Sequence, residues 1–155
     1  MSETDGLPQP LAEIVEDFHA VGDQEKLELL LELSRELPEL PEHLRENYAD
    51  SMEQVVECQS PLFLTIEFHD DDVPGEGTAE LIFSAPAEAP TTRGFASILQ
   101  QGLSGLRYQE ILAVPDDVHQ RLGLGKAITP LRLRGMSAML ARVKRNVRDH
   151  VESSS

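Results

Sequence analysis

The chain of 155 residues is 40% hydrophobic and 26% charged, a length and composition that predict one folded domain and argue against disorder. Its formal net charge of −15 would be repelled by the phosphates of a nucleic acid and would favour a basic surface on a partner protein. One cysteine cannot form an internal disulfide, and the sequence has no recognisable signal peptide or membrane-spanning apolar run. We therefore expect a cytoplasmic protein with no nucleic-acid or membrane partner.

The polar ends of the chain set the limits of the predicted domain. Residues 1–9 are mostly polar and are expected to form a flexible tail. Residues 10–151 are expected to form a single domain, because no change of composition and no internal repeat divides them. Residues 152–155, which are rich in serine, are expected to form a second short tail.

Two apolar helical patterns precede the first predicted strands. Apolar residues recur at helical spacing between residues 11 and 18, and Gly22 is expected to end that helix. Leucines then recur so densely over residues 27–37 that this second helix is expected to pack on two sides. Pro38 and Pro41 are expected to stop it, because proline cannot continue a helix from within.

Strand-like residues occupy the middle of the chain. Two runs rich in β-branched and aromatic residues, 62–68 and 78–84, flank a polar turn with a proline and two glycines, which predicts an antiparallel hairpin. After the hairpin, apolar residues recur at helical spacing over 94–103, and a longer helical pattern starts at Thr129, followed by a proline. Helices, a small antiparallel sheet and further helices predict an α+β fold with helices packed on one face of the sheet.

Cys58 is the first candidate for chemistry because it interrupts the apolar strand-like residues at the loop of Gln59, Ser60 and Pro61. A lone cysteine is more often a small buried hydrophobe than a reactive group, so both interpretations stay open. A nucleophilic thiolate needs exposure and a lowered pKa, and the neighbouring charge of Glu57 works against it. The cations that could offset this charge come later in the chain: Arg93, Lys126, Arg132 and Arg134.

Other kinds of site find little support in the sequence. The five histidines lack the spacing of metal ligands, and one cysteine cannot build a thiolate cage. The run from Asp70 to Asp72 has the start of a calcium loop, but Pro74 stands at a ligand position and Leu81 where the closing glutamate belongs. A cysteine hydrolase would need a histidine that folds against Cys58. We therefore predict neither a metal site nor a bound cofactor.

Segments of the chain match four motifs of one known family, in the family's order. VVECQSPLFL (55–64) is similar to a cysteine-bearing segment that typically reads Gly-Cys-Gln-Ser before an apolar strand, and LPELP (37–41) to a segment that ends a leucine-rich helix upstream of it. TRGFASIL (92–99) is similar to the helix after the sheet. LGL (122–124) and TPLRLRGMSAM (129–139) are similar to the C-terminal pattern. Together these segments resemble the SufE family, the sulfur-acceptor proteins of iron–sulfur cluster assembly.

The resemblance implies a three-stranded antiparallel sheet with helices against it, the fold shared with IscU- and NifU-type scaffold proteins. It implies that Cys58 accepts sulfur from the persulfide of a SufS-type, pyridoxal-phosphate-dependent cysteine desulfurase, enhances its turnover and delivers the sulfur to a SufBCD-type scaffold complex. Gln59 and Ser60 would shape the cysteine loop, and Arg132 matches the arginine of the family's TPxR element, with an electrostatic role near the thiol or the partner. Glu57 departs from the family, which has glycine at this position.

Two classes of function remain open at this point. One is a persulfide carrier that activates a desulfurase, rather than a stand-alone enzyme. The other is a non-catalytic regulatory binding module of the same fold, in which Cys58 stays buried. Only the first needs the thiol, so a Cys58→Ser variant separates the two. Whether the protein forms a homodimer is open as well.

Overall fold

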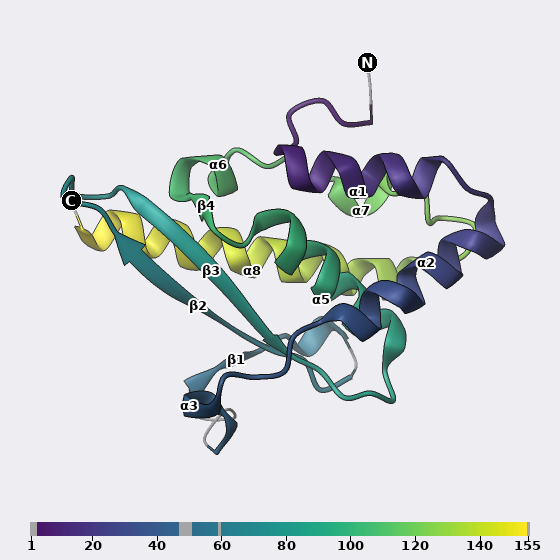
Figure 1. The fold of residues 1–155 in the computed structure, drawn as a ribbon, viewed down its shortest axis with the longest axis horizontal. Coiled ribbons are helices and arrows are strands. Elements are labelled where there is room, and N and C mark those ends of the chain that lie inside the picture. Colours follow the sequence, from purple (N-terminus) through teal and green to yellow (C-terminus); the bar gives the residue numbers. More distant parts are fainter. Residues whose placement is uncertain (1–2, 47–50, 59, 155) are drawn as a thin grey trace.

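The computed structural model describes residues 3–46, 51–58 and 60–154. Its elements follow in the order α1 (Gln9–His19), α2 (Asp23–Glu36), α3 (Glu42–Arg45), β1 (Glu53–Gln54), the 3-10 turn η1 (Val56–Cys58), β2 (Phe63–Asp70), β3 (Gly77–Ser84), α5 (Pro90–Leu103), β4 (Leu106–Arg107), α6 (Tyr108–Leu112), α7 (Val118–Arg121) and α8 (Pro130–Ser154). Figure 1 shows the long α8 running past the β2–β3 hairpin and α5, with α1 and α2 on the other side of α5.

The sheet is antiparallel, with the strand order β1-β2-β3-β4. β2 and β3 form the predicted hairpin, in which Leu64 lies opposite Phe83 and Ile66 opposite Leu81. The predicted α+β class is therefore confirmed. The expected number of strands needs a correction, because the described residues form four strands rather than three. Beyond the hairpin the sheet contains the two-residue edge strands β1 and β4, which are too short to produce an alternating pattern in the sequence.

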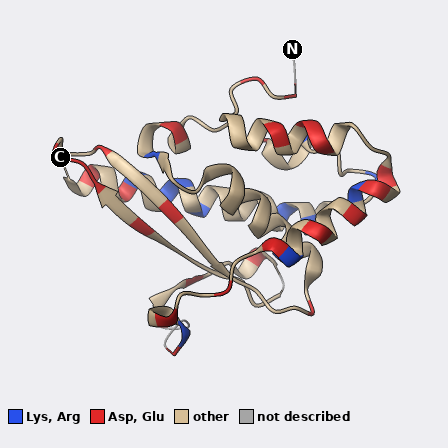
Figure 2. Cartoon of the chain, viewed as in Figure 1, with Lys and Arg blue, Asp and Glu red and all other residues tan. Residues whose placement is uncertain are grey.

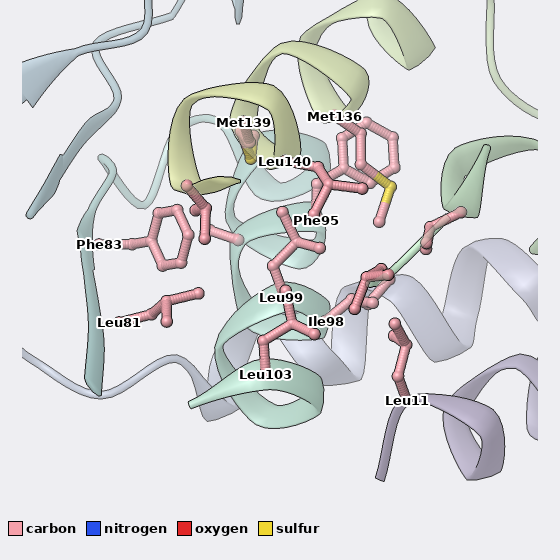
Figure 3. Packing of buried hydrophobic residues seen from close by; sticks show 14 of the residues in the cluster. Leu11, Leu81, Phe83, Phe95, Ile98, Leu99, Leu103, Met136, Met139 and Leu140 are labelled. Atoms are coloured by element: carbon pink, nitrogen blue, oxygen red, sulfur yellow. The ribbon is translucent and has the colours of Figure 1, made fainter. Parts of the chain in front are cut away.

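The hydrophobic core lies between the sheet and the helices. On β3, Ala79, Leu81 and Phe83 alternate along the strand and are each at most 2% exposed. Figure 3 shows Leu81 and Phe83 beside the side chains of α5, with the α8 residues Met139 and Leu140 closing the same space. One face of the sheet is thus covered by helices, as the sequence predicted.

α5 is the central helix of the fold and is buried on more than the single face that its apolar spacing indicated. Two glycines allow this burial. A Cβ atom on Gly94 would lie 2.6 Å from Leu30 Cδ1 of α2, and one on Gly102 would lie 2.8 Å from Leu11 Cδ1 of α1. Both distances are well inside van der Waals contact, so the missing side chains let α1 and α2 approach the backbone of α5 directly.

α8 begins where the sequence predicted, and the backbone N–H of Arg132 donates to Thr129 Oγ1 at 3.3 Å. Its buried apolar positions follow the predicted helical spacing: Met136, Met139, Leu140, Val143 and Val147. The helix continues through residues 152–154, which the sequence suggested as a tail. In this last turn Ser153 Oγ and Ser154 Oγ donate to backbone carbonyls one turn earlier.

Charge is unevenly distributed over these elements. Figure 2 shows acidic residues along α1, α2 and the hairpin, whereas α8 carries most of the basic residues in view. Six of the 13 lysines and arginines of the chain lie in α8. None of the helices in residues 3–46, 51–58 and 60–154 combines the length and the apolar character needed to cross a lipid bilayer.

Candidate functional site

Cys58 lies at the end of the η1 turn, in a loop whose two ends are anchored in the core. The backbone N–H of Val55 donates to the carbonyl of Leu62 at 2.9 Å, and both side chains are fully buried. Inside this closed loop, the N–H of Cys58 donates to the carbonyl of Val55 at 3.2 Å. Val55 and Leu62 lie directly next to β1 and β2, so the two ends of the loop are fixed by the sheet.

The loop rests on the first turns of α8 through Gly135. The thiol of Cys58 donates to the carbonyl of Gly135 at a Sγ–O distance of 3.7 Å. A Cβ atom on Gly135 would lie 3.2 Å from Cys58 Sγ and 3.3 Å from its Cα, closer than ordinary contacts. The glycine thus provides the space in which the cysteine turn packs against the helix.

A cavity of about 400 Å³ opens beside the thiol. It lies between the cysteine loop and the starts of α5 and α8, and it is lined by Cys58, Ser60, Glu88, Ala89, Pro90, Thr91, Thr92, Phe95, Arg132 and Gly135. Three of the predicted site residues therefore meet in one cavity, namely Cys58, Ser60 and Arg132. Arg132 Nη1 donates to Thr91 Oγ1 at 3.3 Å, which joins the two helix starts. The fourth predicted residue, Gln59, lies outside the described residues.

The other three candidate cations of the sequence have different surroundings. Arg93 donates to the backbone carbonyls of Ser34, Leu37 and Ala85, so it joins the end of α2 to the segment after β3. Lys126 and Arg134 are exposed, and neither lines the cysteine cavity.

Arg142, which the sequence reading did not single out, is the cation that contacts the cysteine turn. Its Nη2 donates to Glu57 Oε1 at 2.6 Å, and its Nη1 donates to Glu53 Oε2 at 2.5 Å. Glu53 also accepts hydrogen bonds from Arg145 and Asn146. Burial alone would raise the pKa of Glu53, but these three donors lower it. A hydrogen bond from its own backbone and one from Arg142 lower the pKa of Glu57, so both carboxylates are ionised at neutral pH.

The thiol itself is held in its neutral form. Cys58 is half-buried, and this burial, followed by the charge of Glu57, raises the pKa of the thiol from 9.0 to about 12, while Arg142 acts in the opposite direction. At neutral pH the thiol in this conformation is protonated, and a protonated thiol is a poor nucleophile. In this conformation the surroundings of Cys58 therefore disfavour its thiolate.

A comparison with protein families identifies the chain. The family model described as "SufE: Fe-S metabolism associated domain" matches residues 12–147. The chain belongs to the SufE family. This confirms the resemblance found in the sequence, and it gives the protein a role in iron–sulfur metabolism.

Relatives in the SufE family cover nearly all of the chain. An uncharacterized SufE-like protein of Mycobacterium tuberculosis is 56% identical over 149 residues, which span 96% of this chain and 99% of the relative. An uncharacterized SufE-like protein of Synechocystis is 30% identical over 130 residues, 83% of this chain and 74% of the relative. A solution structure described as a hypothetical protein from Thermus thermophilus has a TM-score of 0.76 and 33% identity, and the match covers 94% of this chain and 98% of that one.

The other kinds of site considered from the sequence were a metal site, a calcium loop and the active site of a cysteine hydrolase. Among the described residues, no group of three or more His, Cys, Asp or Glu side chains is arranged to hold a metal ion. Of the run from Asp70 to Asp72, the first two residues pair with side chains of α6, α8 and β4. The described lining of the cysteine cavity contains no histidine, so the base that a cysteine hydrolase needs is missing from it.

A helical pattern could have pointed to Arg142. It lies seven residues after Gly135, which places both on the same face of α8, two turns apart. Gly135 belongs to the motif that resembles the SufE family. The sequence could therefore have predicted which face of α8 contacts the cysteine loop. What the sequence lacked was any indication that Glu57 reaches that face.

Proposed function

We propose that this SufE-family protein is a sulfur acceptor, which takes sulfur from the persulfide of a pyridoxal-phosphate-dependent cysteine desulfurase onto Cys58 and passes it to an iron–sulfur scaffold complex. Family membership supports the general role, and one observation carries the specific one. That observation is the position of Cys58, the only cysteine of the chain, on a loop anchored at both ends and facing a cavity. This arrangement suits a thiol that is buried at rest and is exposed to the partner's persulfide during transfer.

The transfer is an exchange at sulfur. The Cys58 thiolate attacks the terminal sulfur of the donor persulfide, the sulfur–sulfur bond of the donor breaks, and the donor cysteine leaves as a thiolate. A new persulfide forms on Cys58, and the proton of the Cys58 thiol ends on the donor thiol or on water. One bond between sulfur atoms forms as another breaks, so no external oxidant or reductant is consumed. The acceptor chain needs no metal ion or cofactor of its own for this step.

In this proposal the cysteine loop has two conformations with different roles: a closed one, in which the Cys58 turn packs against α8, and an open one, in which it has left α8. In the closed loop the pKa of Cys58 of about 12 keeps the thiol neutral, so sulfur acceptance requires the turn to leave α8 and enter the partner's active site. When the turn returns to α8 with a persulfide on Cys58, the cavity of about 400 Å³ has room for the additional sulfur atom. The cavity also limits the contact of that atom with water and oxidants. Arg132, at the rim of this cavity, supplies a positive charge for the anionic persulfide.

The partners follow from the same proposal. We expect the donor to be a SufS-type cysteine desulfurase whose turnover increases when Cys58 removes its sulfur, and the recipient to be a SufBCD-type scaffold complex. The net charge of −15 favours docking on basic surfaces. We also propose that this exchange takes place in the cytoplasm.

A second candidate is a regulatory binding module of the same fold in which Cys58 has no chemical task. The half-burial and raised pKa of the thiol favour this candidate, because both are typical of an inert cysteine. Under this reading, the protein changes the turnover of a desulfurase by binding alone. Stimulation of the desulfurase would then survive the Cys58→Ser substitution, which replaces the sulfur with oxygen at nearly the same volume.

The experiment that tests the proposal is the intact mass of the protein after incubation with an active cysteine desulfurase and L-cysteine, without reductant. We expect a gain of one sulfur atom that disappears when a small thiol is added and that is absent in Cys58→Ser. Stimulation of desulfurase turnover should be lost in the same variant. An unchanged mass, while the desulfurase itself carries a persulfide, would reject the carrier and leave the binding module.

A further inference from the structure

The turn that carries Cys58 is attached to α8 by a contact between two residues outside the cavity lining. Glu57, the residue before Cys58, accepts a hydrogen bond from Arg142 Nη2 at 2.6 Å. Because Glu57 and Cys58 are consecutive residues of the same short 3-10 turn, neither can leave α8 without moving the other. The position of the thiol is therefore coupled to an ion pair between side chains that do not line the cavity.

The members of this charge network differ in how firmly they are held. Glu53 accepts hydrogen bonds from Arg142, Arg145 and Asn146, and its side chain is 27% exposed. The side chain of Arg142 is only 19% exposed and lies between the two carboxylates, whereas that of Glu57 is 41% exposed. Arg142 and Glu53 form the fixed part of the network, and the contact between Arg142 and Glu57 is the one that a partner can reach.

We propose that Arg142 is a positioning residue for sulfur acceptance, which holds Glu57 and thereby keeps the Cys58 turn closed against α8 until a basic group of a docking partner takes over Glu57. This inference rests on the proposed function and adds its gating step. A partner cation is the matching chemistry, because the accessible member of the pair is a carboxylate in a chain of net charge −15. Exchange of one cation for another keeps Glu57 neutralised while the turn opens.

The two members of the pair have different effects on the thiol, and this difference makes the proposal testable. Removing Glu57 opens the turn and also removes the negative charge beside Cys58. Removing Arg142 opens the turn but leaves that charge without its counterion, which disfavours the thiolate. Both substitutions should therefore increase opening, and only the loss of Glu57 should also favour ionisation.

The experiment uses the full chain without any partner and measures two quantities on the variants Glu57→Ala and Arg142→Gln. Amide hydrogen exchange of the turn reports opening, since the Cys58 N–H is bonded to the Val55 carbonyl when the turn is closed. The rate of alkylation of Cys58 by iodoacetamide between pH 7 and 9 reports opening together with ionisation. We expect about two- to fivefold faster exchange in both variants, the range of an ion pair with a solvent-accessible member. Alkylation should accelerate clearly more in Glu57→Ala than in Arg142→Gln.

Arg148→Gln is the matched control, because it removes the same charge from an exposed position of the same helix. It should leave both rates at the wild-type value. The double variant Glu57→Ala/Arg142→Gln should exchange no faster than Glu57→Ala alone, since the pair can be broken only once. Wild-type exchange in Arg142→Gln, or additive effects in the double variant, would reject the coupling between Arg142 and the turn.

The outcome is independent of the sulfur-transfer proposal, because neither measurement involves a desulfurase. If the variants open the turn as expected but Cys58 never gains sulfur from a desulfurase, Arg142 holds the turn closed, but the carrier function fails and with it the link to sulfur acceptance. If Cys58 gains sulfur while both variants keep wild-type exchange and alkylation, the carrier function stands and the positioning role fails.

Discussion

At the scale of single residues, the site consists of a half-buried thiol whose surroundings keep it neutral. Burial and Glu57 keep Cys58 protonated, and Gly135 creates the space in which it is buried. The surroundings that bury the thiol thus also disfavour its ionisation. Substitutions at these positions should therefore change the reactivity of Cys58 more than they change the stability of the fold.

The first prediction concerns Gly135→Ala. The added Cβ would lie 3.2 Å from Cys58 Sγ and should push the turn outward, so alkylation of Cys58 by iodoacetamide should become severalfold faster. The free energy of unfolding should change by less than about 1 kcal/mol, because the gain in helix propensity offsets the lost packing. Gly125→Ala is the control, since a Cβ there meets no described atom within 4 Å. Wild-type alkylation of Gly135→Ala would contradict the role of this close contact.

The second prediction concerns pH. The pKa of Cys58 is 9.0 in its ordinary state and about 12 when folded, so the folded state favours the neutral thiol. The contribution of this group to stability is complete below pH 9 and is lost as the pH rises from 9 toward 12. Urea unfolding between pH 8 and 10.5 should show an alkaline loss of stability that is smaller in Cys58→Ser. Parallel curves for the two proteins would mean that the thiol titrates normally in the folded state.

At the scale of elements, two kinds of contact hold the helices around the sheet. Close glycine contacts bring α1 and α2 onto α5, and a small polar cluster joins the far end of β2 to α6 and α8. In that cluster Asp70 accepts hydrogen bonds from Tyr108 and His150, each at 2.7 Å, and the ring of Phe68 stacks on His150 with centroids 3.8 Å apart. The cluster lies apart from the cysteine cavity, whose described lining includes none of these four residues.

The third prediction tests the glycine contact between α2 and α5. In Gly94→Ala the new Cβ would meet Leu30 Cδ1 at 2.6 Å and the Leu30 carbonyl oxygen at 2.8 Å. Because a backbone atom cannot move aside as a side chain does, α2 must shift, and we expect a loss of about 1–3 kcal/mol in the free energy of unfolding. Urea unfolding measures this loss, and Gly125→Ala again serves as the control. Equal stability of the two variants would show that α2 is not held this closely.

The fourth prediction tests the polar cluster. Hydrogen bonds from Tyr108 and then from His150 lower the pKa of Asp70 below its ordinary value of 3.8. The stabilising effect is therefore present above pH 3.8 and is lost as the pH falls through the folded pKa. Asp70→Asn should lower the midpoint of thermal unfolding at pH 7, and the difference from wild type should shrink below about pH 4.

Asp71→Asn is the matched control for this cluster, because Asp71 pairs only with an exposed Arg107 among the interactions described for it. Such an exposed pair contributes little to stability. An equal effect of both substitutions at pH 7 would mean that the contacts of Asp70 with α6 and α8 have no special role.

At the scale of the whole molecule, charge is the dominant property. The net charge is −15, yet nearly half of the basic residues lie on α8, the helix that receives the cysteine turn. Within the proposed function, this distribution lets the acidic exterior attract a basic partner while the site itself keeps positive charge for the persulfide and for Glu57.

The fifth prediction follows from this charge distribution. The rate of sulfur loading from a desulfurase at limiting protein concentration should fall by about tenfold when salt is raised from 50 to 500 mM, because ions screen the long-range attraction. The maximal rate at saturating protein should change far less. Turnover of the desulfurase alone, with a small thiol as acceptor, is the control for direct effects of salt. An equal response with both acceptors would exclude electrostatic steering.

The sequence by itself determined the α+β class, the β2–β3 hairpin, the start of α8, the loop position of Cys58 and the SufE family. These features rest on local patterns or short motifs, which are legible within a few residues. Only the tertiary structure decided that the thiol is half-buried, that Arg132 and Ser60 share its cavity and that Arg142 pairs with Glu57. Glu57 and Arg142 are 85 positions apart, and such a contact depends on how α8 crosses the cysteine loop, which no local pattern encodes. The positions of the two-residue strands could not be predicted for a related reason, because their partners along the sheet, rather than their own residues, make them strands.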